Sequence, residues 1–236
     1  MILYTKGEMR MKKFILPIML ALAVMASMTA CGQNASQTGP TEPEVTDSNN
    51  VGYVTLANGT LTVSTADKNA AEINVPEKLD NKKVTKLSKS AFKMFKAETI
   101  VLPETLESIS DYAFAFCKNL KSVNIPSKVK KIGQNSFTAC ESLKTITLPE
   151  GLKSIGVFAF NGSGLETITI PKSVKSIQSF AFAECEGLKE VTITGDSTQL
   201  DDKTFTSSDN VTIIAPKDSE AIKYAKDNNI KYKTSN

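Results

Sequence analysis

Apolar and polar residues alternate over short stretches, and proline closes many of these stretches. In one copy of the pattern Val123 and Ile125 alternate with polar residues, and Pro126 follows. Such alternation predicts a short strand with one buried face, and proline ends it because its nitrogen donates no hydrogen bond.

The rest of the same copy predicts a second short strand and a turn. Val129 and Ile132 form the next apolar pair, and Phe137 and Cys140 follow. Phe137 and Cys140 stand three residues apart, a helical or turn spacing that points both side chains the same way. The first strand, the second strand and the helical turn together make one coil.

The whole pattern returns from residue 99 onward with a period of 22 or 23 residues. The repeated prolines are Pro103, Pro126, Pro149 and Pro171, and the repeated phenylalanines are Phe114, Phe137, Phe160 and Phe182. Such a period predicts a solenoid, because one unit cannot cover its own apolar face and must stack on the next. Equivalent residues of successive coils should lie about 4.8 Å apart, the spacing of neighbouring strands.

Both ends of the repeat predict caps. Residues 53–64 alternate about Asn58-Gly59, a strong hairpin signal, and the unit that follows is about four residues longer than the others around 80–83. At the other end a decayed unit leads to a last strand at 211–216 and a short helix at 219–228, capped by Asp218 or Ser219.

These motifs resemble the BspA-like, or treponemal-type, bacterial surface leucine-rich repeats, whose unit is LxxIxIPxxVxxIGxxAFxxC. The resemblance covers roughly residues 73–210, although Lys128 and Gly151 replace the asparagine of better-known leucine-rich repeats. It implies an α/β leucine-rich-repeat solenoid of short parallel strands with helical turns, an N-terminal β-hairpin cap and a C-terminal strand/helix cap. It also implies adhesion at the cell surface to host matrix proteins or glycans.

The N-terminus predicts export. A basic start at Met11 precedes an apolar run that ends in small residues before Cys31. The stretch 28–32, MTACG, resembles the lipobox of bacterial lipoproteins, which implies cleavage before Cys31 and lipidation of its thiol. An ordinary secretory signal cleaved near Ala30 is the alternative.

We therefore expect an extracytoplasmic protein that a lipid on Cys31 anchors to the cell membrane at the cell surface. The expected segments are a signal peptide (1–30), the lipidated cysteine with a disordered tether (31–50), the hairpin cap (51–72), the repeats (73–210) and the C-terminal cap (211–236).

Composition excludes several classes of site. The chain has no His and no Trp, and Arg10 is its only arginine. An imidazole base, the commonest metal ligand and the planar phosphate-binding fork are therefore missing from the folded part. The formal charge of +3 lies within residues 1–30, so the remainder is neutral and nothing indicates nucleic acid. We expect a monomer without cofactor, metal or catalytic activity.

Three cysteines recur with the repeat. Cys117, Cys140 and Cys185 each follow a repeat phenylalanine by three residues, and Ser163 takes that place once. Filling of the core explains this recurrence most simply. A Cys117–Cys140 disulfide is the alternative, because neighbouring coils bring the two residues within bridging distance.

Two rows of outward residues are candidate binding surfaces. On the first strands these residues are Ser122, Asn124, Thr145, Thr147, Thr167, Thr169 and Thr192. They form either an extended binding face, as repeat proteins often present, or simply the Thr-rich surface that exposed strands favour. On the second strands Lys130, Lys131, Lys153 and Lys175 form either a site for anionic cell-wall polymers or a solvated face that opposes aggregation.

The acidic residues Asp201, Asp202 and Asp209 are the only close acidic group that merits consideration, and a polar cap loop explains them. The sequence thus predicts a non-catalytic surface module for protein or glycan ligands. A structural or assembly scaffold within the cell envelope is the alternative.

Overall fold

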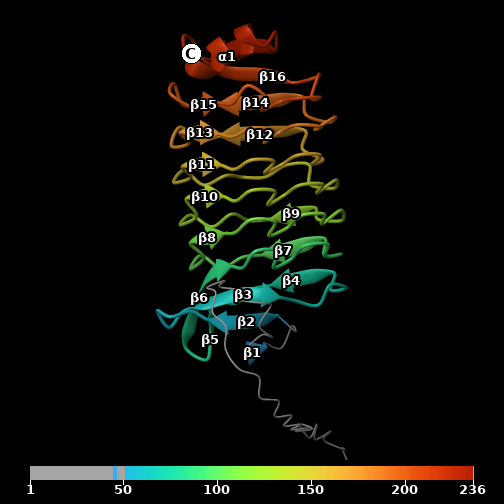
Figure 1. Cartoon of the computed structure of the whole chain (residues 1–236), viewed down its shortest axis with the longest axis vertical. Coiled ribbons are helices and arrows are strands. Elements are labelled where there is room, and N and C mark those ends of the chain that lie inside the picture. The colour runs from blue at the N-terminus through green and yellow to red at the C-terminus, as the bar shows by residue number, and fades with distance from the viewer. Residues whose placement is uncertain (1–44, 47–50, 236) are drawn as a thin grey trace, which may run out of the picture. The chain divides into compact units, whose positions relative to one another are not determined.

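The computed structural model describes residues 45–46 and 51–235, all of which lie in one compact unit, Pro40–Asn236 (Figure 1). The predicted signal peptide and Cys31 lie outside the described residues. Within the stretch predicted as a tether, β1 (Val45–Thr46) pairs antiparallel with β2 (Gly52–Thr55).

Short strands stack in register to form the solenoid that the repeat predicts (Figure 1). The second strands of successive coils build one long sheet in the order β1-β2-β3-β6-β8-β10-β11-β13-β15, and its pairs from β3 to β15 are parallel. Beyond β1 and β2 these strands are β3 (Leu61–Thr65), β6 (Lys82–Leu87), β8 (Ser108–Ile109), β10 (Lys131–Ile132), β11 (Ser154–Ile155), β13 (Ser176–Ile177) and β15 (Gln199–Leu200).

The first strands of the coils form two shorter parallel sheets. One contains β4 (Glu72–Asn74), β7 (Thr99–Val101) and β9 (Ser122–Val123). The other contains β12 (Thr167–Ile170), β14 (Glu190–Ile193), β16 (Thr212–Pro216) and β17 (Lys231–Ser235).

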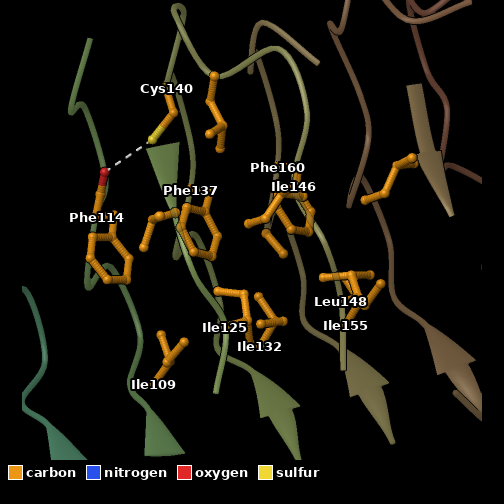
Figure 2. Packing of buried hydrophobic residues seen from close by; sticks show 14 of the residues in the cluster. Ile109, Phe114, Ile125, Ile132, Phe137, Cys140, Ile146, Leu148, Ile155 and Phe160 are labelled. Atoms are coloured by element: carbon orange, nitrogen blue, oxygen red, sulfur yellow. Dashed lines mark hydrogen bonds between the residues drawn. The ribbon is translucent and has the colours of Figure 1, made fainter. Parts of the chain in front are cut away.

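The core between the sheets is a ladder of identical residue types. Six phenylalanine rings stack along the solenoid, with neighbouring centroids 4.9–5.6 Å apart. These rings belong to Phe92, Phe114, Phe137, Phe160, Phe182 and Phe205. Figure 2 shows three of them, with the isoleucines of the second strands packed nearby. The stack confirms the predicted coil spacing and extends into the decayed unit.

The segment around each stacked phenylalanine is a series of hydrogen-bonded turns. Alternate N–H groups bond within the coil and to the next coil: Cys117 N donates to Phe114 O, whereas Phe114 N donates to Ser136 O. The predicted helical turn therefore takes the form of a third inter-coil ladder, and its geometry requires left-handed residues two positions before and after the phenylalanine. The pairs are Ser90 and Met94, Tyr112 and Phe116, Asn135 and Ala139, Phe158 and Gly162, and Phe180 and Glu184.

One hairpin lies in the N-terminal cap and another in the first repeat unit. In the predicted one, β2 pairs antiparallel with β3, and Gly59 supplies a positive φ of 78° in the connection. In the other, β5 (Lys78–Leu79) pairs antiparallel with β6 through Asp80 and Asn81. The extra residues around 80–83 thus form a tight turn at Asp80 and Asn81 and the start of β6, a hairpin that the sequence pattern did not predict.

The C-terminal cap closes the other end with a helix and two strands. In α1 (Glu220–Asp227) the Ser219 hydroxyl accepts a hydrogen bond from the N–H of Ile222, which satisfies one of the unpaired N–H groups of the first turn. The strand predicted at 211–216 is β16, and β17 adds a parallel strand that was not predicted. Among the described residues, no helix has both the length and the apolar character needed to cross a membrane.

Candidate functional site

The predicted sheet face lies on the first strands of the coils. Residues alternate between buried and outward along β12, so that Thr167 and Thr169 face out. Thr169 is in register with Thr192 on β14, which is half-buried. Ser122, Asn124, Thr145 and Thr147 are exposed as predicted. The structure therefore places all seven candidate residues on one face.

The face is divided at residues 145–148. This segment forms no strand and separates the sheet that ends at β9 from the sheet that begins at β12. Within the described part of the chain, no hydrogen bond involves the backbone N–H or C=O groups of these four residues. They alternate as the residues of β12 do, so the sequence contains no signal for this opening.

A hollow of about 370 Å³ lies between residues 121–125 and 145–149. Exposed Ser122, Asn124, Thr145 and Thr147 contribute polar groups to it. Its apolar lining is less completely buried than the equivalent core elsewhere: Val123 and Ile125 are each 8% exposed, whereas Val191 and Ile193 are fully buried. The hollow thus combines hydroxyl and amide groups with an apolar floor.

The Asn124 side chain forms two hydrogen bonds that stabilise the fold. Its Nδ2 donates to the Leu102 carbonyl at 2.8 Å, and its Oδ1 accepts from the Leu102 N–H at 2.7 Å. The side chain thereby replaces a strand ladder with the preceding coil. Both polar ends of the amide thus bond to the preceding coil, while Asn124 also lines the hollow.

The predicted lysine row is continuous along the solenoid. Lys153 N donates to Lys130 O, and Lys175 N donates to Lys153 O, so neighbouring coils hold these residues side by side. These three residues precede the assigned strands, whose outward residues are Lys131, Ser154 and Ser176. The four predicted lysines are exposed. Binding of an anionic polymer there stays a prediction.

The structure places the three acidic residues in two surroundings. Asp201 accepts hydrogen bonds from the N–H and hydroxyl of Ser179 at 2.8 and 2.9 Å. Asp202 and Asp209 line a separate hollow of about 370 Å³ beside α1. Across the residues that the structure describes, no group of three His, Cys, Asp or Glu side chains could hold a metal ion.

The three repeated cysteines are buried and free, as the core interpretation predicts, and no Cys117–Cys140 disulfide is present. Each thiol contacts the phenylalanine carbonyl of the preceding coil: Cys117 Sγ lies 2.9 Å from Phe92 O, and Cys140 Sγ lies 3.2 Å from Phe114 O (Figure 2). Burial raises the pKa of Cys117 to about 11 and that of Cys140 well above its ordinary value. Since the thiolate is the reactive form, the folded protein keeps these groups inert.

Comparison with known proteins identifies the repeat. The BspA type leucine rich repeat region matches in six copies, over residues 67–138 and 85–212. The chain belongs to this family. The BspA type repeat indicates a surface module for interaction with other molecules. No curated protein is similar to the chain.

Solved structures share the solenoid. A leucine-rich repeat protein from Bacteroides ovatus is 34% identical with a TM-score of 0.64, covering 70% of this chain and 45% of that protein. The T. pallidum leucine rich repeat protein is 23% identical with a TM-score of 0.64, covering 72% of this chain and 81% of that protein. The pneumococcal vaccine antigen PcpA is 23% identical with a TM-score of 0.62, covering 80% of this chain and 49% of that protein. The chain thus spans less than half the length of the first and third, and the last two show the fold alone.

Proposed function

We propose that this BspA type protein is a non-catalytic surface lipoprotein, anchored through a lipid on Cys31, that binds protein or glycan ligands on its sheet face. Two facts support the proposal. The chain consists largely of BspA type leucine rich repeats, and repeat proteins commonly present an extended binding surface. The sheet face presents a row of outward hydroxyl and amide groups.

The opening of the sheet at residues 145–148 carries this proposal. In the β12–β14 ladder, by contrast, the backbone groups of neighbouring first strands bond to each other. At the opening, N–H and C=O groups lie beside Thr145, Thr147 and an apolar floor. A sugar ring offers hydroxyl groups and an apolar C–H surface together, so the chemistry of the hollow suits a neutral glycan best.

The first prediction concerns two pairs of threonines. On a glycan and matrix-protein array probed with the full chain, Thr145→Lys with Thr147→Lys should reduce binding by roughly tenfold or more, because the larger side chains fill the hollow. The matched control is Thr167→Lys with Thr169→Lys, which lies on the same face beyond the hollow and should bind nearly as the parent does.

The array separates the alternatives. Binding that survives the Thr145 and Thr147 changes would contradict a site at the hollow. Equal loss in both variants would spread the site along the face. If no glycan or matrix protein binds the parent chain, the adhesion proposal is wrong and the envelope scaffold becomes the better explanation. Unfolding curves of all variants check that the outward substitutions leave the fold intact.

A further inference from the structure

Large apolar residues occupy left-handed positions along the turn edge of the solenoid. Five of these positions hold such side chains, namely Met94, Tyr112, Phe116, Phe158 and Phe180, with φ between 54° and 63°. The inter-coil ladder fixes this backbone conformation, but it does not require a large side chain, since Ser90, Asn135 and Gly162 occupy equivalent positions.

Bulky residues are rare in this conformation, because their Cβ approaches the backbone too closely. At Met94 and Phe116 the side chain gains little burial in return, since these residues are 63% and 40% exposed. Strained residues that the fold does not need indicate a role beyond stability.

Three of these apolar residues gather with two lysines at the N-terminal part of the edge. Lys93 Nζ lies 5.7 Å from the ring centroid of Tyr112 and 5.8 Å from that of Phe116, and Lys89 Nζ lies 5.6 Å from that of Tyr112. We call Lys89, Lys93, Met94, Tyr112 and Phe116 the turn patch.

The turn patch carries positive charge without acidic partners. Among the ion pairs of the described residues, none includes Lys89 or Lys93. Asp111, which directly precedes Tyr112, accepts a hydrogen bond from the N–H of Gln134 at 2.8 Å in the next coil. Glu98, the carboxylate nearest Lys93 in sequence, pairs with Lys121 at 2.8 Å. The two ammonium groups are therefore available to an acidic ligand.

We propose that the turn patch binds an acidic, apolar segment of a partner protein. Carboxylates of the segment pair with Lys89 and Lys93, while its aliphatic or aromatic side chains cover Met94 and Phe116. Tyr and Met are enriched at protein interfaces, and methionine adapts to differently shaped partners. An anionic polysaccharide would engage the lysines but leave the apolar residues uncovered, which favours a protein.

The same edge offers a matched control. Phe158 and Phe180 occupy the left-handed position before the stacked phenylalanine in neighbouring coils, as Tyr112 does. Their rings stack on each other with centroids 4.8 Å apart and planes 3° apart. Because these two rings cover each other, a substitution there changes the edge without changing the turn patch.

The test is selection of a random-peptide display library on the full chain. We expect the enriched peptides to combine Asp or Glu with aromatic or aliphatic residues. Met94→Ser with Phe116→Ser should weaken the best peptide about tenfold or more. Lys89→Gln with Lys93→Gln should weaken it and reduce its salt dependence, whereas Phe158→Ser with Phe180→Ser should leave its affinity unchanged.

Several results would overturn the proposal. One is enrichment without acidic residues, and another is equal loss of affinity in the control variant. A third is binding of a heparin probe that needs the lysines but not Met94 or Phe116. Stability provides a separate check: Phe116→Gly should leave the denaturation midpoint unchanged or raise it, because glycine relieves the left-handed strain. A clear fall of the midpoint would assign Phe116 to the fold.

Discussion

At the scale of the residue, one position in the coils from Cys117 onward shows why cysteine and serine can replace each other. At Cys117, Cys140, Cys185 and Ser208, the side chain three residues after the stacked phenylalanine contacts the phenylalanine carbonyl of the preceding coil. Ser163 Oγ instead lies 3.5 Å from Cys185 Sγ. Cys185 Sγ lies 3.1 Å from Phe160 O, and Ser208 Oγ donates to Phe182 O at 2.7 Å. A small side chain with a weak or strong donor satisfies the same buried carbonyl, so the position does not depend on thiol chemistry.

The second prediction is a pH-dependent loss of stability caused by Cys117. Its pKa rises from 9.0 to about 11 on folding, because burial disfavours the thiolate. Below the unfolded pKa both states keep the proton, and folding is indifferent to pH through this group. Between the two pKa values only the unfolded state ionises, so stability falls as pH rises. At pH 10.5 the loss from Cys117 is about 2 kcal/mol.

Cys117→Ser removes this contribution, since serine already occupies the equivalent place at Ser163 and Ser208. Urea unfolding at pH 7.5 and 10.5 under reducing conditions measures the difference. The parent should lose about 2 kcal/mol more than the variant over this interval, because only the parent contains the Cys117 thiol. An identical decline in the two proteins would show that Cys117 ionises normally in the fold.

At the scale of the element, alternation predicted strands well but not their pairing. Asn58-Gly59 identified the β2–β3 hairpin, because its turn needs a residue with positive φ. The alternation at residues 145–148 predicts a strand, but the structure has none there. Strand pairing depends on where the neighbouring coils lie, and the local sequence pattern does not determine this. β17 escaped prediction because four of its five residues are exposed and lack a buried face.

The third prediction concerns the turn that joins β5 to β6. Asp80 and Asn81 both adopt positive φ, at 48° and 61°. Alanine at both places should disfavour the turn by about 1–2 kcal/mol per residue. Trypsin should cleave the parent hairpin slowly after Lys82 or Lys83. It should cleave the Asp80→Ala, Asn81→Ala variant at these sites roughly tenfold faster or more.

The control variant is Asp80→Asn with Asn81→Gly, which trypsin should cleave no faster than the parent. Mass spectrometry locates the cuts, and equal rates in all three proteins would contradict the role of this turn.

At the scale of the whole molecule, the solenoid makes the fold more predictable than the site. Each coil contacts its neighbours through the same inward residues. The strands and turn predicted for one repeat unit therefore predict those of the other units. The outward direction of Thr145 and Thr167 followed from the same alternation, and the structure agrees. The hollow did not follow, because it arises from the separation of two coils whose sequences look alike. The turn patch was missed because its apolar residues fall outside both strands.

The last prediction uses this modularity to separate fold from site. Deletion of residues 145–166 removes one whole unit, joins Lys144 to Thr167, and lets Phe182 stack on Phe137. We expect a soluble protein that still unfolds cooperatively, with a smaller denaturant dependence because less surface is buried.

Deletion of residues 145–155 removes only half a unit and breaks the register of the core, so this matched variant should lose cooperative unfolding.

The whole-unit deletion also tests the binding site. If the opening belongs to residues 145–148 themselves, this deletion closes the sheet between β9 and β12 and abolishes array binding. The turn patch should still bind its selected peptides. Retention of array binding by this protein would show that ligand recognition does not need the hollow.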